Sequence, residues 1–211
     1  MNLVKSKDRV RDFGEVFTPF WLVQDMLNLV PRELERIDSK FLETACGSGN
    51  FLVAVLAKKL AIVDARYSSG EFERRHHGLL ALMSIYGIEI QSDNALECRA
   101  NLMDLFASHF KIEKDDPLHL AGSAVLSNNI VIGDALSLRN SKGEALVFAE
   151  WAYLGKGKFQ RRDFIFSELI QMSSFGEGTL FSNMKPDEIF KPITVHPQVN
   201  IGDLPDLAPI N

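Results

Sequence analysis

The sequence has few cysteines and no long apolar run, and each shortage excludes a class of protein. Its two cysteines, Cys46 and Cys98, are too few for a disulfide framework or a zinc ligand set, so we expect both to be reduced. No uncharged apolar stretch approaches the roughly 18–20 residues that a membrane-spanning helix needs. The N-terminus is too polar for a signal peptide. These absences predict a cytoplasmic protein.

An excess of positive charge is also missing. The chain carries 23 Lys and Arg against 28 Asp and Glu, a formal net charge of −5. This balance argues against a surface built throughout for nucleic acid, so any such partner requires a local basic patch. With 46% hydrophobic residues in 211, the chain has enough apolar surface for a core. Its length predicts one large domain, or one domain with an appendage.

The patterning divides the chain into three expected segments. Residues 1–13 form a polar arm without a clear period, residues 14–172 form the domain, and residues 173–211 form an irregular extension rich in Gly, Pro, Asn and Asp. In the domain, Thr18 and Pro19 suit the N-cap and first position of a helix over 18–30.

Strand and helix patterns then alternate, which predicts a parallel α/β sheet. The expected strands are 40–45, 86–90, 129–132 and, with weaker signals, 145–148; the expected helices follow the first strand and cover about 71–84, 92–110 and 163–172.

A glycine turn, Gly47-Ser48-Gly49, lies where the first expected strand enters its helix. Ligands of parallel sheets bind at the carboxyl ends of strands, where glycines admit a close approach and a helix N-terminus offers N–H donors. The third glycine of the dinucleotide fingerprint is missing, since Asn50 follows. The turn therefore favours a nucleotide-like ligand without a pyrophosphate.

Acidic residues end the next two expected strands. Glu89 can accept hydrogen bonds from both ribose hydroxyls of a nucleoside, at about 1.5–3 kcal/mol each. Ile90 can flank an adenine ring, and Asp134 can accept from an exocyclic amine. Alternatively, Glu89 is a solvated strand-end acid and Asp134 a turn former after Gly133. The occurrence of suitable groups at three strand ends favours the nucleoside pocket.

Four segments together resemble a known family. They are GEVFTPFWLV (14–23), ETACGSGNFL (43–52), YGIEIQSDN (86–94) and NIVIGDAL (129–136). In this order they resemble motifs X, I, II and III of the γ-type DNA adenine-N6 methyltransferases of bacterial restriction–modification systems. The resemblance covers about residues 14–136. It implies a Rossmann-like fold that binds S-adenosylmethionine (SAM), with a mostly parallel sheet, helices on both faces and a possible truncation.

The resemblance also implies roles for individual residues. The FTP segment would close over the methionine end of SAM, the glycine turn would underlie it, Glu89 would hold the ribose, and Asp134 would border the adenine with Ala135. Motif I opens with Glu43-Thr44 in place of the usual Asp-Pro, and Glu43 keeps the charge for the methionine ammonium. The expected cofactor residues are Phe17, Thr18, Pro19, Glu43, Ala45, Cys46, Gly47, Gly49, Glu89, Ile90, Asp134 and Ala135.

The catalytic motif of the family, Asn/Asp-Pro-Pro-Tyr/Phe, does not occur. None of the eight prolines is adjacent to another, and the corresponding place is occupied by ALVFAEWAYL. In one interpretation Glu150 accepts a hydrogen bond from an amine and Trp151 or Tyr153 stacks on a base. In the favoured interpretation the aromatics pack in the core and Glu150 lies on the surface. The catalytic residue therefore stays unassigned.

A basic stretch, GKGKFQRRDF (155–164), gives the best local signal for nucleic acid. Its basic residues surround an aromatic, which suits phosphate contact with base stacking. Four phosphate contacts would give a salt slope of about −3.6, from about −0.9 per contact. Alternatively, the stretch is a solvated loop before a helix that Asp163 caps. The nucleic-acid candidates are Lys156, Lys158, Phe159, Arg161 and Arg162.

The sequence thus predicts a SAM-binding, DNA adenine-N6 methyltransferase-like protein of a restriction–modification or defence system. The family's target-recognition region is also missing, so we expect weak DNA binding and a second methyltransferase or specificity subunit as partner. A non-catalytic SAM- or DNA-binding scaffold, or a methyltransferase for RNA, protein or a small molecule, stays open. No His/Cys cluster has metal-ligand spacing, so no metal is expected.

Overall fold

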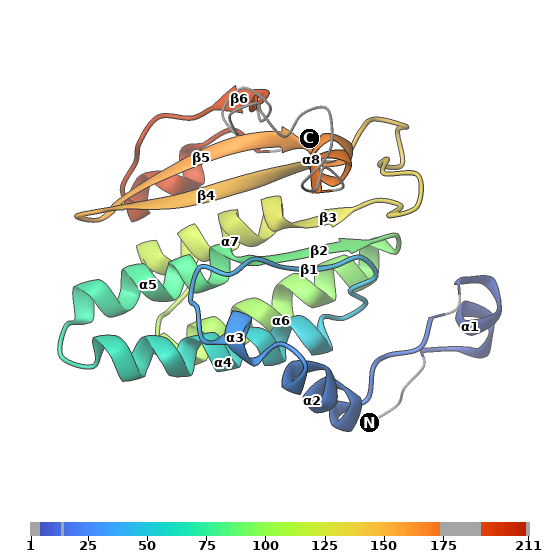
Figure 1. Cartoon of the computed structure of the whole chain (residues 1–211), viewed down its shortest axis with the longest axis horizontal. Coiled ribbons are helices and arrows are strands. Elements are labelled where there is room, and N and C mark those ends of the chain that lie inside the picture. Colours follow the sequence, from blue (N-terminus) through green and yellow to red (C-terminus); the bar gives the residue numbers. More distant parts are fainter. Residues whose placement is uncertain (1–4, 14, 174–190, 210–211) are drawn as a thin grey trace, which may run out of the picture.

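A small parallel sheet forms the centre of the computed structural model, which describes residues 5–13, 15–173 and 191–209. Strands β1 (Phe41–Glu43), β2 (Ile85–Glu89) and β3 (Ile130–Ile132) pair in this order, all parallel. Their carboxyl ends therefore meet at one edge of the sheet (Figure 1). The chain has the mixed α/β class expected from the alternating pattern.

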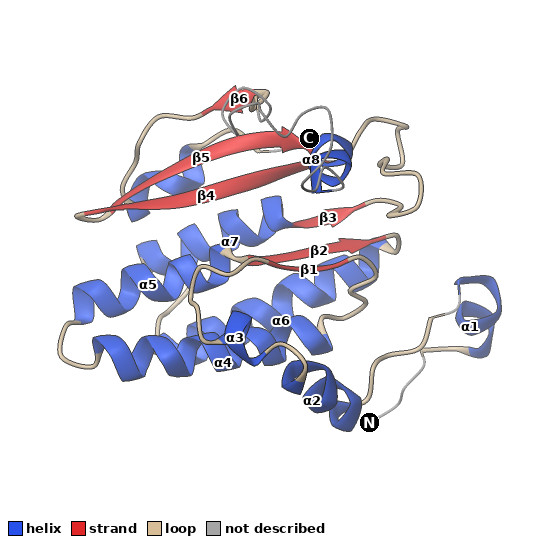
Figure 2. Ribbon diagram, in the orientation of Figure 1, coloured by secondary structure: helices blue, strands red, loops and turns tan. Residues whose placement is uncertain are grey.

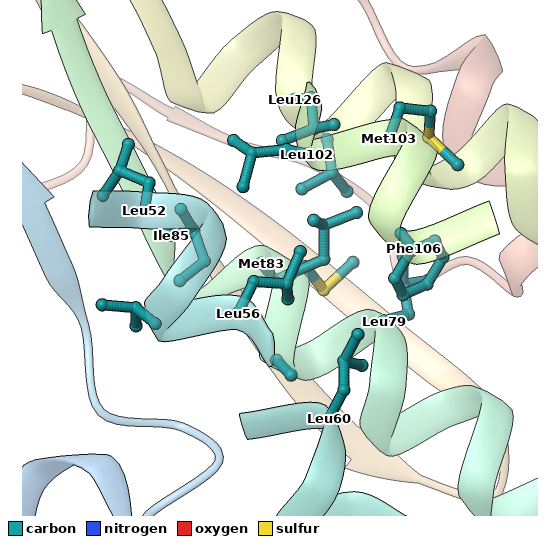
Figure 3. Packing of buried hydrophobic residues seen from close by; sticks show 14 of the residues in the cluster. Leu52, Leu56, Leu60, Leu79, Met83, Ile85, Leu102, Met103, Phe106 and Leu126 are labelled. Atoms are coloured by element: carbon teal, nitrogen blue, oxygen red, sulfur yellow. The ribbon is translucent and has the colours of Figure 1, made fainter. Parts of the chain in front are cut away.

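Four helices connect these strands and bury their apolar faces together. They are α4 (Asn50–Tyr67), α5 (Glu71–Met83), α6 (Ser92–Phe110) and α7 (Pro117–Asn129). Leu52, Leu56 and Leu60 recur at helical spacing along α4 and are almost completely buried. Figure 3 shows them in one cluster with Leu79 of α5 and Phe106 of α6. This core holds the sheet and its connecting helices as one body.

The four helices pack on one face of the sheet, and a β-hairpin covers the other face. The sequence had instead predicted helices on both faces. Strands β4 (Val147–Gly155) and β5 (Lys158–Ile165) are antiparallel (Figure 2). Tyr86 and Ile88 of β2 pack in a second cluster with Phe148. The Tyr86 hydroxyl donates to the Ala149 carbonyl at 2.9 Å, which fixes the hairpin over the sheet.

The hairpin corrects three expectations for residues 145–172. The fourth strand pairs with β5 and not with the parallel sheet, the basic stretch is a strand and not a loop, and the last helix is α8 (Phe166–Ser173). Lys156 and Gly157 both have positive φ, 53° and 76°, as a two-residue hairpin turn of type I′ requires. Asp163 lies within β5 and therefore caps no helix.

The helical expectations are mostly confirmed. Helix α6 has the predicted bounds, and α5 ends one residue early. Helix α2 (Phe20–Asn28) is shorter than predicted, because Pro19 takes the N-cap position with extended backbone and Thr18 precedes a proline. Helix α3 (Pro31–Leu34) follows. Helix α7 was not predicted, although Pro117 occupies its first position and the Asp116 side chain caps it.

The two ends of the chain contain regular structure where they are described. The arm forms α1 (Lys7–Phe13). Of the expected C-terminal extension, residues 174–190 lie outside the described part. Residues 191–209 carry β6 (Thr194–Val195), which pairs with β5, and a 3-10 helix, η1 (Ile201–Asp206). None of the described helices is long and apolar enough to cross a membrane.

Candidate functional site

A cavity of about 350 Å³ opens at the carboxyl ends of the three parallel strands. The segment before α2, the glycine turn and the ends of β2 and β3 all contribute to this strand-end cavity. Its lining residues are Glu15, Val16, Phe17, Thr44, Ala45, Gly47, Glu89, Ile90, Gln91, Asn94, Gly133, Asp134, Ala135 and Leu136. The fold thus brings together the segments that the sequence marked as motifs.

A smaller pocket of about 30 Å³, the Glu43 pocket, adjoins the strand-end cavity. The two share Val16, Phe17, Ala45 and Gly47. The Glu43 pocket is otherwise lined by Thr18, Glu43, Cys46, Ser48, Asn50 and Phe51. Because the walls are shared, the two hollows form one elongated site.

The glycine turn between β1 and α4 requires glycine at two positions. Gly47 has φ +52° and Gly49 has φ +87°, a region that residues with a Cβ rarely adopt. A Cβ at Gly47 would lie 3.3 Å from the Phe17 ring, and one at Gly49 would lie 2.7 Å from Cys98 Sγ. Gly49 is also the N-cap of α4, so the free amides of that helix begin at the turn.

The Glu89 carboxylate joins the end of β2 to this turn. Its Oε2 accepts from the Gly47 N–H at 2.7 Å, and its Oε1 accepts from the Gln91 N–H at 2.9 Å. The residue is 7% exposed, so it is not the solvated acid of the alternative interpretation. Each carboxylate oxygen has a second lone pair for a ligand donor.

Asp134 stabilises a turn after β3 and also lines the strand-end cavity. Its carboxylate accepts from the Leu136 N–H at 2.9 Å and the Ser137 N–H at 3.3 Å. These hydrogen bonds lower the pKa of Asp134. They match the turn-forming interpretation, and the turn places the acid at the cavity edge.

Two buried carboxylate oxygens lack a hydrogen-bond partner among the residues that the structure describes, Oε1 of Glu15 and Oε2 of Glu43. Burial, followed by the nearby charge of Glu89, raises the pKa of Glu43 to about 8. An unpartnered buried acceptor is costly, and a hydrogen-bond donor or cation from a ligand would offset that cost. Both residues line the elongated site.

Most of the predicted cofactor residues meet in this site. Phe17, Ala45, Gly47, Glu89, Ile90, Asp134 and Ala135 line the strand-end cavity, while Thr18, Glu43 and Cys46 line the Glu43 pocket. Pro19 and Gly49 line neither and instead act through the backbone as helix N-caps. The sequence interpretation missed Glu15, Gln91 and Asn94. They lie inside the quoted motif segments, so a polar side chain within a motif was the available signal.

Glu150 and Trp151 do not line the elongated site. Trp151 is 6% exposed, and its Nε1 donates to Asn129 Oδ1 at 2.8 Å, which matches the packing interpretation for this one residue. Glu150 pairs with Lys40 at 2.8 Å and with Arg162 at 2.5 Å. It lines a separate, largely apolar cavity of about 190 Å³ under the hairpin.

The basic stretch does not form a continuous exposed surface. Phe159 and Arg161 are 0% and 1% exposed, so burial contradicts their expected contact with nucleic acid. Lys156, Lys158 and Arg162 are exposed. Figure 1 shows the hairpin turn at the end of the molecule opposite the carboxyl ends of β1–β3. Lys156 and Lys158, which flank this turn, are therefore remote from the elongated site, and Arg162 does not line it.

The parallel sheet, the glycine turn and the acid-lined cavity fit the class of methyltransferase-like α/β proteins. The sequence model of the N-6 DNA methylase family matches residues 5–133, more than half of the 211 residues. The chain therefore belongs to the N-6 DNA methylase family. No curated protein and no solved structure matches it. The matched range ends one residue after β3, so it contains the elongated site except for Asp134, Ala135 and Leu136, and it does not contain the hairpin.

Proposed function

We propose that the elongated site binds SAM and that the chain is the cofactor-binding part of a DNA adenine-N6 methyltransferase of the γ type. The observation that carries this proposal is the Glu89 carboxylate, buried at the strand-end cavity and bonded to the glycine turn within the family-matched range. The cavity volume of about 350 Å³ falls within the roughly 300–1,000 Å³ of small-molecule sites. When bound, SAM would supply an electrophilic methyl group.

The residues present suit the two ends of SAM. The unpartnered Oε2 of Glu43, in the smaller pocket, would accept the methionine ammonium beside Phe17 and Thr18. In the strand-end cavity Glu89 would accept the ribose hydroxyls. Ile90, Asp134 and Ala135 would border the adenine.

The group that binds the target amine is proposed to come from outside these 211 residues. The sequence contains no Pro-Pro pair, and the candidates at the corresponding place, Glu150 and Trp151, line no part of the elongated site. We therefore propose a second methyltransferase or specificity chain, which would also hold and read the DNA, as in a restriction–modification or defence system.

Two measurements test the proposal. Calorimetry should detect binding of SAM, and Glu89→Gln should weaken it about tenfold or more, since a charge-assisted acceptor is lost. Glu113→Gln, the same change on an exposed turn, should leave binding unchanged. Absence of SAM binding by the wild-type chain would overturn the cofactor assignment.

The second measurement is transfer of labelled methyl from SAM to DNA, with and without the product of the adjacent gene. We expect transfer only when both chains are present. A chain that binds SAM and supports no transfer with any partner would instead be a non-catalytic scaffold. The buried position of Trp151 favours that second candidate.

A further inference from the structure

The N-terminal arm is held on the body by charged contacts. None of its residues with a described side chain, Lys5 to Arg11, is buried. Figure 1 shows α1 standing away from the sheet and the core helices. Apolar burial therefore contributes little to the docking of the arm, and its position depends on individual polar contacts.

Lys5 and Arg9 make these contacts at the first two turns of α6. Lys5 Nζ lies 3.2 Å from Asp93 and 2.6 Å from Glu97, and it donates to Asn94 Oδ1 at 2.7 Å. Arg9 binds both carboxylate oxygens of Asp93, at 2.7 and 3.1 Å. The two cations thus bridge the arm to the rim of the strand-end cavity.

Arg9 continues from this rim to a residue of the cavity wall. It pairs with Glu15 Oε2 at 2.5 Å, and Asn94 Nδ2 donates to the same oxygen at 2.9 Å. The Glu15 side chain is 7% exposed, and both Glu15 and Asn94 line the cavity. The carboxylate is therefore held from one side by the arm and from the other by α6, while its Oε1 has no partner among the described residues.

We propose that Arg9 is a positioning residue that holds Glu15 in the wall of the strand-end cavity, so that affinity for an S-adenosyl ligand depends on docking of the arm. This inference rests on the proposed SAM site. Without Arg9, the Glu15 carboxylate loses its counter-charge and one of the two groups that orient it. The Arg9–Asp93 ion pair is open to solvent, since the Asp93 side chain is 51% exposed. Dissolved salt therefore weakens this pair, with a Debye length of about 10 Å at 0.1 M.

Calorimetric titration of the full chain with S-adenosylhomocysteine tests the coupling. We expect Arg9→Gln to weaken binding about tenfold and Arg9→Lys to restore part of the loss, since lysine keeps the charge without the two-pronged contact. Lys7→Gln is the matched control, because it removes the same charge from the same helix, and exposed Lys7 makes no ion pair with the described residues.

Salt dependence separates positioning from a general loss of stability. Raising the salt from about 0.05 to about 0.5 M should weaken binding several-fold in the wild type and in Lys7→Gln, and hardly at all in Arg9→Gln. Equal affinities of Arg9→Gln and the wild type at low salt would overturn the proposal. So would equal salt dependences.

Amide hydrogen exchange of the segment around Glu15, without ligand, keeps the two proposals distinguishable. Arg9→Gln should speed exchange there, and Lys7→Gln should not. If the wild type binds no S-adenosylhomocysteine while exchange follows this pattern, the SAM proposal fails and the positioning of Glu15 by the arm stands. If exchange in Arg9→Gln equals the wild type, the positioning is overturned whether or not the ligand binds.

Discussion

Glu89 Oε2 accepts a hydrogen bond from the Gly47 N–H at 2.7 Å, and this contact ties the end of β2 to the turn after β1. The second oxygen of the carboxylate is bonded to the Gln91 N–H. Hydrogen bonds to a charged group contribute about 1.5–3 kcal/mol each. Glu89 therefore shapes the turn before any ligand arrives, and its remaining lone pairs face a preformed site.

Glu43 should make the stability of the protein depend on pH. Burial raises its pKa to about 8 in the folded chain, from the ordinary value of 4.5. The stabilisation linked to this proton is fully present below the unfolded pKa and is lost as the pH rises through the folded pKa. The free energy of unfolding of the wild type, relative to Glu43→Gln, should therefore fall between these values by on the order of 1 kcal/mol per pH unit.

Urea denaturation at about pH 5, 7 and 9 checks the Glu43 prediction, with Glu113→Gln as the control for the same chemical change at an exposed site. The difference between wild type and Glu113→Gln should not vary with pH in this range. Parallel pH profiles of the wild type and Glu43→Gln would contradict the prediction.

Arg161 should be far more important for stability than its neighbour Arg162. Arg161 is 1% exposed, binds both oxygens of Asp163 at 2.6 and 2.9 Å, and donates to the Ala208 carbonyl at 2.7 Å. Arg161→Met leaves the buried Asp163 without its main counter-charge, which should cost about 3–5 kcal/mol.

Arg162→Met removes a pair with Glu150 whose side chains are 46% and 29% exposed, and should cost about 0–1 kcal/mol. Chemical denaturation of the two variants side by side gives the comparison. Similar losses in both would show that the inward and outward faces of β5 are energetically alike, contrary to the structure.

The hairpin that carries Arg161 shows what the sequence could and could not predict. Helix α6 and the glycine turn were predictable, because a clear helical period and the Gly-x-Gly spacing are local signals. The hairpin was not predictable from the sequence. Arg161 and Asp163 point inward and form an ion pair with each other. Polar residues therefore occupy inward positions, and the alternation of apolar and polar residues that indicates a half-buried strand is lost.

Helix α7 and part of the site escaped prediction for a related reason. Leu120 is exposed on this helix while Asn128 and Asn129 are buried, so apolar and polar residues do not separate onto two faces that would mark the helical period. Glu15 and Asn94 become wall residues of the strand-end cavity only through folding of the arm segment onto α6. Residue type and spacing alone do not encode such a contact.

Lys59 should stabilise the loop before β1. Its Nζ donates to the carbonyls of Ile37, at 3.0 Å, and Ser39, and to the Ser84 hydroxyl at 2.8 Å. Lys59→Met keeps the apolar length of the side chain but leaves these buried acceptors without a donor, at a cost of about 3 kcal/mol. Lys58→Met, on the exposed side of the same turn of α4, should change the free energy of unfolding by less than about 0.5 kcal/mol. Equal urea midpoints for the two variants would refute this role.

Gly49 should tolerate no side chain, for two separable reasons. Its φ of +87° strains any residue with a Cβ, and that Cβ would meet Cys98 Sγ at 2.7 Å. Gly143 has a similar φ of +80° with open space around it, so Gly143→Ala measures the backbone cost alone, about 1–2 kcal/mol. Gly49→Ala should cost about 1–3 kcal/mol more than Gly143→Ala, roughly the penalty of overpacking a core.

The difference between the unfolding free energies of Gly49→Ala and Gly143→Ala isolates the cost of the contact with Cys98. Combining Gly49→Ala with Cys98→Ala should recover most of this cost. If the double variant is no more stable than Gly49→Ala, α6 does not limit the space at the glycine turn.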